Sequence, residues 1–513
     1  MAQDQTQDQT EAQQQNHDDS AAANTPAPKR PWNAFATPLV GKAVREASRL
    51  LHHGGSAFPG KIAEDIDPGF LARTLGQLPL GVVLVSGTNG KTTTTRMVAS
   101  LMADLGLKVF TNPTGSNFTR GVVSALLEQV TLSGKLDADI AVLELDEAYA
   151  VHFVHQVRPR YALLLNVMRD QLDRFGEIDN TARLLGHVAE ATDGTVVLNR
   201  EDPRIAALAS VTPAHTKVQY FGLADDLKHF FPSDDDMATT VAVEAAEDAG
   251  SAEPATAATQ SSASPASAPQ STDTLPADVT LTRVGDHEAS FLISGESQPR
   301  TTTVRLEGVY NLYNAAAALA VVRAVQADAR AAAVAPAATA RTGSLAARVS
   351  AFAEADADAL LDAVSRVTPA FGRGETIEVN GSEIQLLLVK NPMGFRLSLG
   401  SFPPAGHETM IIINDEYADG RDMSWLWDVD FTSLRETGVA MVSGTRAWDM
   451  ALRLEYDRVT VEQTGTDLES AVKQFATANP GVPKHIYCTY TAMLRTRAEL
   501  AKLTHVADAG VGR

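Results

Sequence analysis

Cysteine, basic residues and long apolar runs are all scarce in this sequence. Cys488 is the single cysteine among 513 residues, which excludes an internal disulfide and a cysteine-rich zinc site. Lys and Arg together number 43 against 63 Asp and Glu, so the formal net charge is -20. Because proteins hold nucleic-acid phosphates with clustered Lys and Arg, this balance argues against a nucleic-acid binder. Small-molecule substrates or a protein partner fit it better.

The lack of long apolar runs argues against membrane insertion. No stretch reaches the length of a transmembrane helix, and the N-terminus has neither the basic start nor the apolar stretch of a signal peptide. We therefore expect a cytoplasmic protein. Cys488 lies in an apolar, strand-like run without the glycine turn that exposes a nucleophile, so it is predicted to be a buried core residue.

Composition separates folded from unfolded parts of the chain. The length favours two folded domains. Residues 1–38 are rich in Gln, Asp, Thr and Ala and predict a disordered tail, while 232–278 have low complexity and predict a flexible insertion within a domain. The Ala-rich stretch 328–358 has few large apolar residues and is interpreted as a linker. The folded domains then span 39–327 and 359–513.

Short apolar runs alternate with helical patterns in the first domain. Near-continuous apolar runs are typical of strands buried on both faces of a parallel sheet. Such runs lie at 82–86, 140–145, 161–166 and 195–199. They predict an α/β doubly wound fold. Polar residues close three of the runs, namely Glu144, Asn166 and Asn199, and we expect them at strand carboxyl ends, where such sheets bind ligands.

A glycine-bounded loop follows the run at 82–86 and precedes a predicted helix at 93–105. Its residues are Gly87, Thr88, Asn89, Gly90, Lys91, Thr92 and Thr93. Backbone N–H groups of such a loop converge on phosphate oxygens, Lys91 adds a positive charge from an exposed position, and a Thr hydroxyl can ligate Mg²⁺. The spacing is shorter than in the commonest P-loop, because Val85 stands where that motif has its first glycine. The loop predicts a nucleotide site.

The run G-T-N-G-K-T-T-T in this loop resembles the ATP-binding motif of the Mur ligase family, and four further motifs of that family follow in order. They lie at 166–176, 198–203, 308–314 and 372–375. The resemblance covers most of residues 40–513. It implies a central P-loop ATPase domain with a parallel sheet, a smaller α/β C-terminal domain, and ATP with Mg²⁺ as cofactors.

The same resemblance assigns roles to individual residues. It implies that Lys91 and Glu144 act in catalysis, that Thr92 and Glu144 bind Mg²⁺, and that Asn311 and Arg373 belong to the ATP site. Asn311 matches the first Asn of G-x-H-N-x-x-N, which lies near the adenine in the family. Gln171 stands where the family commonly has the histidine ligand of a second metal.

Three C-terminal segments resemble the MurT family of ligase subunits, which pair with a GatD-type glutaminase. They are 388–395, 414–428 and 489–494. The resemblance implies ATP-dependent amidation of the D-glutamate α-carboxylate in the stem peptide of lipid II or of its peptide precursor. Many MurT proteins carry a four-cysteine zinc ribbon in the central domain, where this chain has the low-complexity segment after Phe231. We therefore expect no zinc.

The resemblance also suggests that an aspartate of this chain completes the partner's glutaminase site. The candidates are Asp415, Asp419, Asp422 and Asp428. We favour Asp422, with Asp428 second, because a carboxylate that orients an imidazole assists a Cys-His pair. Trp425 and Trp427 beside them supply the apolar anchors that interfaces favour.

Two other functions fit parts of the sequence. An amino-acid-adding ligase, of the folylpolyglutamate or peptidoglycan synthetase kind, would share the P-loop and need no glutaminase. A non-enzymatic P-loop scaffold or switch would share the loop but have no evident need for Lys91, Glu144 and Arg373. ATP hydrolysis coupled to acceptor and ammonia distinguishes an amidating ligase from both.

Overall fold

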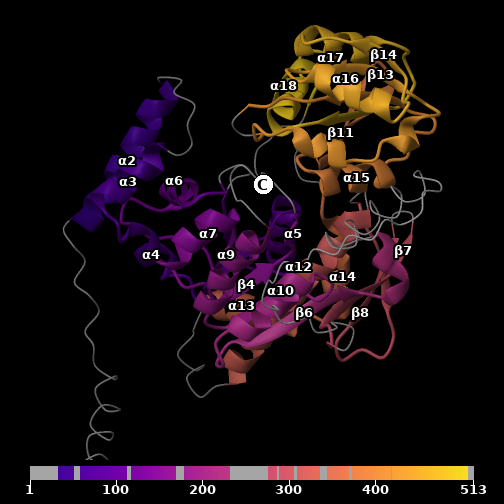
Figure 1. Cartoon of the computed structure of the whole chain (residues 1–513). Helices are drawn as coiled ribbons and strands as arrows, with labels where there is room; N and C mark the ends of the chain where they lie inside the picture. The colour runs from indigo at the N-terminus through magenta and orange to yellow at the C-terminus, as the bar shows by residue number, and fades with distance from the viewer. Residues whose placement is uncertain are drawn as a thin grey trace, which may run out of the picture.

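The computed structural model describes residues 33–50, 58–112, 117–168, 178–230, 275–285, 288–305, 309–334, 344–368, 373–416 and 419–506. Most of the predicted tail and insertion lie outside these residues, although helix α2 already begins at Asn33. Two sheets divide the described chain into a first domain and a C-terminal domain (Figure 1). No helix in these ranges is both long and apolar enough to cross a membrane.

The first domain is built on a nine-stranded sheet with the order β2-β3-β1-β4-β5-β6-β7-β8-β9. Neighbouring strands pair in parallel across the sheet from β2 to β7, whereas the pairs β7–β8 and β8–β9 are antiparallel. The strands are β1 (Val82–Ser86), β2 (Val109–Thr111), β3 (Ile140–Glu144), β4 (Tyr161–Leu164), β5 (Thr195–Asn199), β6 (Lys217–Leu223), β7 (Val279–Gly285), β8 (Glu288–Ile293) and β9 (Arg300–Thr303). The four runs predicted as buried parallel strands are β1, β3, β4 and β5, and every residue in them is buried.

Helices cover both faces of this sheet. Successive side chains of β1 alternate between two apolar cores, with Val83 in one and Leu84 in the other, because side chains of a strand point to opposite faces. One face is covered by α5 (Lys91–Asp104), α12 (Val309–Val334), α13 (Ser344–Glu354) and α14 (Ala357–Arg366). The other is covered by α3 (Phe58–Ile66), α4 (Phe70–Leu75), α6 (Thr119–Gln129), α7 (Glu147–Val154), α9 (Ile178–Ala191) and α10 (Pro203–Ala206), with α2 (Asn33–Leu50) against α3 and α6.

The Ala-rich stretch interpreted as a linker belongs instead to the core of the first domain. Helix α12 continues to Val334, and α13 packs against it. Phe352 of α13 is fully buried, and Gln326 of α12 donates to its carbonyl at 2.9 Å. The linker interpretation relied on the shortage of large apolar residues, but small alanines let helices approach closely and still bury their surface. The change of domain therefore falls after α14.

The C-terminal domain has a six-stranded sheet with the order β10-β11-β15-β12-β13-β14, parallel except between β10 and β11. The strands are β10 (Arg373–Val379), β11 (Ser382–Leu388), β12 (Glu408–Ile412), β13 (Val439–Ser443), β14 (Val461–Thr464) and β15 (Lys484–Cys488). One face packs on α15 (Pro392–Ser401), the 3-10 helices η6 (Ser424–Asp428) and η7 (Thr432–Leu434), and α16 (Ala447–Tyr456). The other packs on α17 (Leu468–Thr477) and α18 (Tyr490–Leu500).

Cys488 ends the central strand β15 and is completely buried, as predicted. Burial raises the pKa of its thiol well above the ordinary value, with a smaller contribution from the charge of Asp419. A thiol that stays protonated and inaccessible is not a nucleophile.

Candidate active site

The predicted phosphate loop connects β1 to α5 at the carboxyl edge of the first sheet. Gly87 and Gly90 have φ values of 134° and 83°, a region that favours glycine. A Cβ on Gly90 would lie 2.6 Å from Oδ1 of Asn314, so the loop also needs glycine for space. Helix α5 begins at Lys91, two residues before the predicted start. The first N–H groups of α5 therefore belong to the loop, as phosphate binding requires.

Lys91 is buried, with 6% of its surface exposed, and not exposed as the loop sequence suggested. Its Nζ lies 3.1 Å from Oδ1 of Asp146 and 3.3 Å from Oε2 of Glu147. Nζ also donates to the carbonyl of Thr88 at 3.5 Å. The difference arises because the start of α7, which carries these two carboxylates, packs over the side chain. Lys91 is thus held in place at the loop by a second element.

Glu144 and Thr92 meet at the carboxyl end of β3. The hydroxyl of Thr92 donates to Oε1 of Glu144 at 2.8 Å. Asn112 fixes the backbone of Glu144 by accepting from its N–H and donating to its carbonyl, both at 2.9 Å. Magnesium typically binds one or two protein carboxylates together with substrate phosphates and water. A buried carboxylate and a hydroxyl beside the phosphate loop fit such an ion.

No group of three or more His, Cys, Asp or Glu side chains able to hold a metal is found among the described residues. The segment with Gln171 lies outside those residues. The structure therefore describes the candidate Mg²⁺ site at Thr92 and Glu144, but it does not describe the segment that would hold a second metal.

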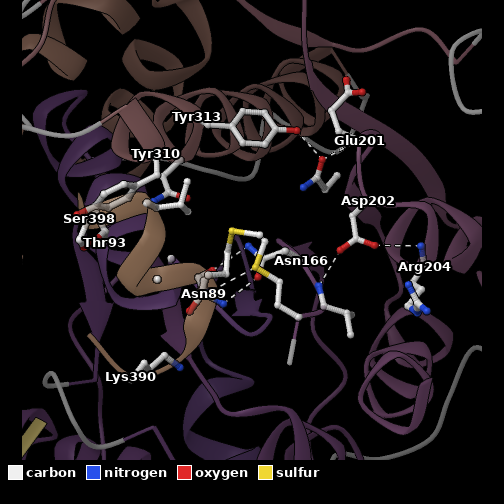
Figure 2. Close-up of a pocket in the computed structure, with 18 of the residues that line it drawn as sticks. Asn89, Thr93, Asn166, Glu201, Asp202, Arg204, Tyr310, Tyr313, Lys390 and Ser398 are labelled. Carbon is white, nitrogen blue, oxygen red and sulfur yellow. Dashed lines mark hydrogen bonds between the residues drawn. The ribbon is translucent and has the colours of Figure 1, made fainter. Parts of the chain in front are cut away.

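A pocket opens beside the loop between the two domains (Figure 2). Its walls come from the loop, the ends of β4 and β5, helix α12, and the start of the C-terminal domain. The lining residues are Asn89, Gly90, Thr93, Asn166, Val167, Met168, Asn199, Glu201, Asp202, Pro203, Arg204, Tyr310, Tyr313, Asn314, Leu388, Lys390, Met393, Gly394, Leu397 and Ser398. A pocket with aromatic and aliphatic side chains in its walls, next to a phosphate loop, suits a nucleotide base.

Asn166 and Asn199, predicted at strand ends, both line this pocket. Asn166 supports the phosphate loop, because its Oδ1 accepts from the N–H of Asn89 at 2.8 Å and its Nδ2 donates to the carbonyl of Asn89 at 3.1 Å. Asn199 donates to the carbonyl of Leu165 at 2.8 Å and accepts from the hydroxyl of Tyr313. These amides brace the pocket walls from the neighbouring strands.

Asp202 is a buried carboxylate at the pocket. Its Oδ2 accepts from the N–H of Val167 at 2.7 Å, and its Oδ1 accepts from the N–H groups of Arg204 and Ile205 at 3.0 and 3.1 Å. It therefore caps α10 and ties that helix to the segment after β4. Burial raises the pKa of Asp202 to about 6, although the three backbone donors act in the opposite direction.

Helix α12 contributes Tyr310, Tyr313 and Asn314 to the pocket. All three lie in the motif identified at 308–314, but a site role was predicted there for Asn311 alone. Their spacing of i, i+3 and i+4 places them on one helix face and is the signal that could have identified them. Asn311, the predicted adenine residue, is buried in the same helix and is not among the lining residues. Arg373 opens β10, and its side chain lies outside the described part of the chain.

The C-terminal domain contacts the phosphate loop directly. Nζ of Lys390 donates to the carbonyl of Thr88 at 2.9 Å. Nδ2 of Asn391 donates to Oδ1 of Asn89 at 2.9 Å, while Oδ1 of Asn391 accepts from the N–H of Gly394 and caps α15. Figure 1 shows α15 on the side of its domain that faces the first domain.

The four candidate aspartates of the C-terminal domain differ in environment, and none lines the pocket. Asp419 is buried and accepts from the N–H of Thr491 at 2.7 Å, and burial raises its pKa. Asp415 accepts from the hydroxyl of Thr445 at 2.8 Å. Asp422 lies two residues before η6, Asp428 is the last residue of η6, and both are exposed. A hydrogen bond with Ser424 lowers the pKa of Asp422, so this carboxyl stays ionised at neutral pH.

Comparisons with known proteins agree with this architecture. The family model described as "Mur ligase middle domain" matches residues 85–249, and the one described as "MurT ligase C-terminal" matches 388–493. The subunit MurT of lipid II isoglutaminyl synthase (glutamine-hydrolyzing) from Streptococcus pneumoniae is 29% identical over 478 residues, which cover 87% of this chain and 92% of that protein. The corresponding subunit from Staphylococcus aureus strain COL is 27% identical over 455 residues, covering 84% and 89%.

Solved structures of the same fold include MurF from Acinetobacter baumannii, with a TM-score of 0.59 at 16% identity over 86% of this chain and 80% of that one. MurF from Thermotoga maritima in complex with ADP has a TM-score of 0.55 at 17% identity, covering 85% and 84%. The fold and the two matched domains show a Mur ligase-like α/β architecture with a second sheet in the C-terminal domain, which confirms the predicted fold class. Over most of its length the chain is similar to the two MurT subunits, and its C-terminal domain matches the MurT model.

Proposed function

We propose that this chain is the ligase subunit of a lipid II isoglutaminyl synthase. It uses ATP and Mg²⁺ to amidate the α-carboxylate of D-glutamate in the stem peptide of lipid II or of its peptide precursor, at the cytoplasmic side of the membrane. The observation that carries the proposal is the phosphate loop with Lys91 and Glu144 next to a pocket closed by a domain of the MurT type.

A carboxylate is a poor electrophile, so it must be activated before ammonia can attack it. An oxygen of the substrate carboxylate attacks the γ-phosphorus of ATP, and the bond between that phosphorus and the β-phosphate oxygen breaks. ADP departs, and the substrate is now an acyl phosphate. Ammonia then attacks the carbonyl carbon, the bond to the phosphate oxygen breaks, and the released phosphate takes the proton that nitrogen loses. Lys91 offsets charge on the phosphate oxygens. A Mg²⁺ ion bound by Thr92 and Glu144 would supply further positive charge there.

Ammonia must come from elsewhere, since the chain has one cysteine and that thiol is buried. A glutaminase partner of the GatD type would supply it. An exposed aromatic face on the C-terminal domain suits such a partner; it consists of Trp427, Trp448, Leu452 and Tyr456, with exposed fractions from 47% to 69%. The last three recur every fourth residue along α16, and the rings of Trp427 and Tyr456 lie 5.0 Å apart. Large exposed aromatic groups are typical anchors of protein interfaces.

Asp422 lies close in sequence to this aromatic face and is the preferred carboxylate for the partner's Cys-His pair. Asp419 is buried against Thr491, and Asp415 is half-buried and accepts from Thr445, which leaves Asp422 and Asp428 as the exposed candidates. Asp422→Asn should leave the complex assembled and sharply reduce glutamine-dependent amidation, while added ammonium restores part of it. Unchanged glutamine hydrolysis in both Asp422→Asn and Asp428→Asn complexes would rule out a shared catalytic group.

The proposed function is tested by purifying the chain with its glutaminase and analysing lipid II by mass spectrometry after incubation with ATP and glutamine. Conversion of the D-glutamate carboxyl to an amide, dependent on both reagents, is the expected product. Addition of an amino acid in place of the amide would identify the alternative, an amino-acid-adding ligase. ATP binding with no product would point to the scaffold alternative.

A further inference from the structure

Two lysines from different domains converge on one carbonyl of the phosphate loop. The carbonyl of Thr88 accepts from Nζ of Lys91 at 3.5 Å and from Nζ of Lys390 at 2.9 Å. Lys91 opens α5 in the first domain, whereas Lys390 follows β11 in the C-terminal domain and lines the pocket. Figure 2 shows Lys390 on the same side of the pocket as Asn89. The C-terminal domain thus delivers a second ammonium group to the loop.

A pair of amides holds this arrangement together. Asn391 donates to Oδ1 of Asn89 at 2.9 Å, and Nδ2 of Asn89 lies 3.3 Å from Oδ1 of Asn391. Asn391 is 1% exposed and also caps α15, in which Pro392 occupies the first turn. A buried side chain fixed by a helix cap and a reciprocal amide pair has little freedom. The neighbouring Lys390 is therefore fixed relative to the loop.

The charges around Lys91 explain why a second cation matters. Asp146 and Glu147 both lie within 3.3 Å of its ammonium group, so two negative charges offset one positive charge. The phosphoryl group that is transferred carries further negative charge. Charge development in such a site is stabilised by preorganised cations more effectively than in water, because the site is partly shielded from solvent.

We propose that Lys390 is a second catalytic cation, which contacts the transferred phosphoryl group and the acyl phosphate when the two domains meet. The proposal rests on the proposed ligase function. Lys390 takes no part in bond breaking; it offsets charge on the phosphoryl oxygens while the substrate carboxylate attacks and ADP leaves. Since Lys390 comes from the C-terminal domain, acyl phosphate forms at full rate when that domain is docked on the loop.

The test compares Lys390→Gln with Lys390→Arg in the full-length chain purified with its partner. Glutamine keeps a side-chain N–H donor for the Thr88 carbonyl but removes the charge, whereas arginine keeps the charge. Hydroxylamine replaces ammonia as the nucleophile, so acyl phosphate is measured as hydroxamate on the stem peptide, and the dissociation constant of ATP is measured in parallel. Lys217→Gln is the matched control, because Lys217 is exposed and pairs with Asp328 at 2.9 Å, and neither residue lines the pocket.

We expect Lys390→Gln to lower the maximal rate of hydroxamate formation about 100-fold, with ATP affinity changed less than about threefold, and Lys390→Arg to retain a substantial part of the rate. Lys217→Gln should behave as the wild type. A Lys390→Gln variant with a normal maximal rate would overturn the proposal, as would a loss explained entirely by weaker ATP binding. Absence of hydroxamate from the wild-type complex would instead overturn the proposed function, and this proposal with it.

Discussion

Lys91 illustrates how a residue type can be predicted while its surroundings cannot. The loop sequence predicts that Lys91 binds phosphate, but its burial depends on α7, whose Asp146 and Glu147 are more than fifty positions away. Asn166 and Asn199 could be predicted to lie at strand carboxyl ends, because each is the last residue of an apolar run. Lys390 and Tyr313 were not predicted as pocket residues, because their role depends on how a distant domain and a distant helix dock.

Lys91→Ala should abolish amidation, since removing one such charge commonly costs about 100-fold or more in rate. It should also destabilise the first domain by roughly 3 kcal/mol, because the buried carboxylate of Glu147 and the half-buried carboxylate of Asp146 lose their partner. Rate with ammonium and thermal unfolding should be measured together, with Lys217→Ala as the control. Near-normal turnover by the folded Lys91→Ala variant would refute the assignment of the ATP site.

Because of the raised pKa of Asp202, the free energy of unfolding should depend on pH. Its pKa is about 6 in the fold against an ordinary 3.8, so its contribution is greatest below the unfolded value and is lost as pH rises from about 4 to 6. Asp202→Asn does not titrate. The destabilisation caused by this substitution should therefore shrink by about 2 kcal/mol between pH 4 and pH 7, as measured by urea unfolding. A destabilisation that is constant over this range would contradict the raised pKa.

At the scale of elements, apolar runs predicted the buried strands correctly, whereas the Ala-rich sequence did not reveal its helices. The runs at 82–86 and 195–199 are strands with the predicted ends, because continuous apolar sequence leaves few alternatives in a parallel sheet. The helix after the loop was also predicted, with an error of two residues at its start. The Ala-rich stretch was misread as a linker, since the pairing of α13 with α12 is a tertiary contact without a strong local pattern.

Helix α16 is predicted to contact the glutaminase through its exposed aromatic residues. Trp448→Ala and Tyr456→Ala should each weaken binding of the glutaminase by about 2 kcal/mol, or roughly 30-fold, because exposed aromatic anchors dominate interface energies. Ammonium-dependent amidation should change little. Leu132→Ala is the control, because Leu132 is equally exposed but lies on the first domain. Unchanged affinity in both aromatic variants would exclude this face as the docking surface.

At the scale of the whole molecule, the low-complexity insertion should be dispensable. Residues 231–274 lie outside the described part of the chain. Strand β6 and the 3-10 helix η3 (Asp225–Phe230) precede them, β7 follows them, and β6 and β7 are neighbours in the sheet. Replacing about 233–276 with a short Gly-Ser linker should leave amidation and partner binding largely unchanged, because such a composition supports neither a core nor a fixed site. Loss of ligase activity in a soluble, folded variant would show that the insertion contributes to substrate or partner contact.

The division of labour between the two domains is the central claim. The first domain supplies the phosphate loop, and the C-terminal domain closes the pocket. We propose that the first domain also binds Mg²⁺ and that the C-terminal domain presents a surface to a glutaminase. The domain types could be predicted from motifs, because each motif stays within one local element. The contact between Asn391 and the loop could not, since it joins residues 302 positions apart.

The most direct test of this claim is the mass of lipid II after incubation with the purified complex, ATP, Mg²⁺ and either glutamine or ammonium. We expect an amide at the D-glutamate α-carboxylate with either nitrogen source, and stoichiometric release of ADP and phosphate. With the ligase chain alone, we expect amidation from ammonium and none from glutamine. Unmodified lipid II under all of these conditions, with folded protein that binds ATP, would contradict this claim.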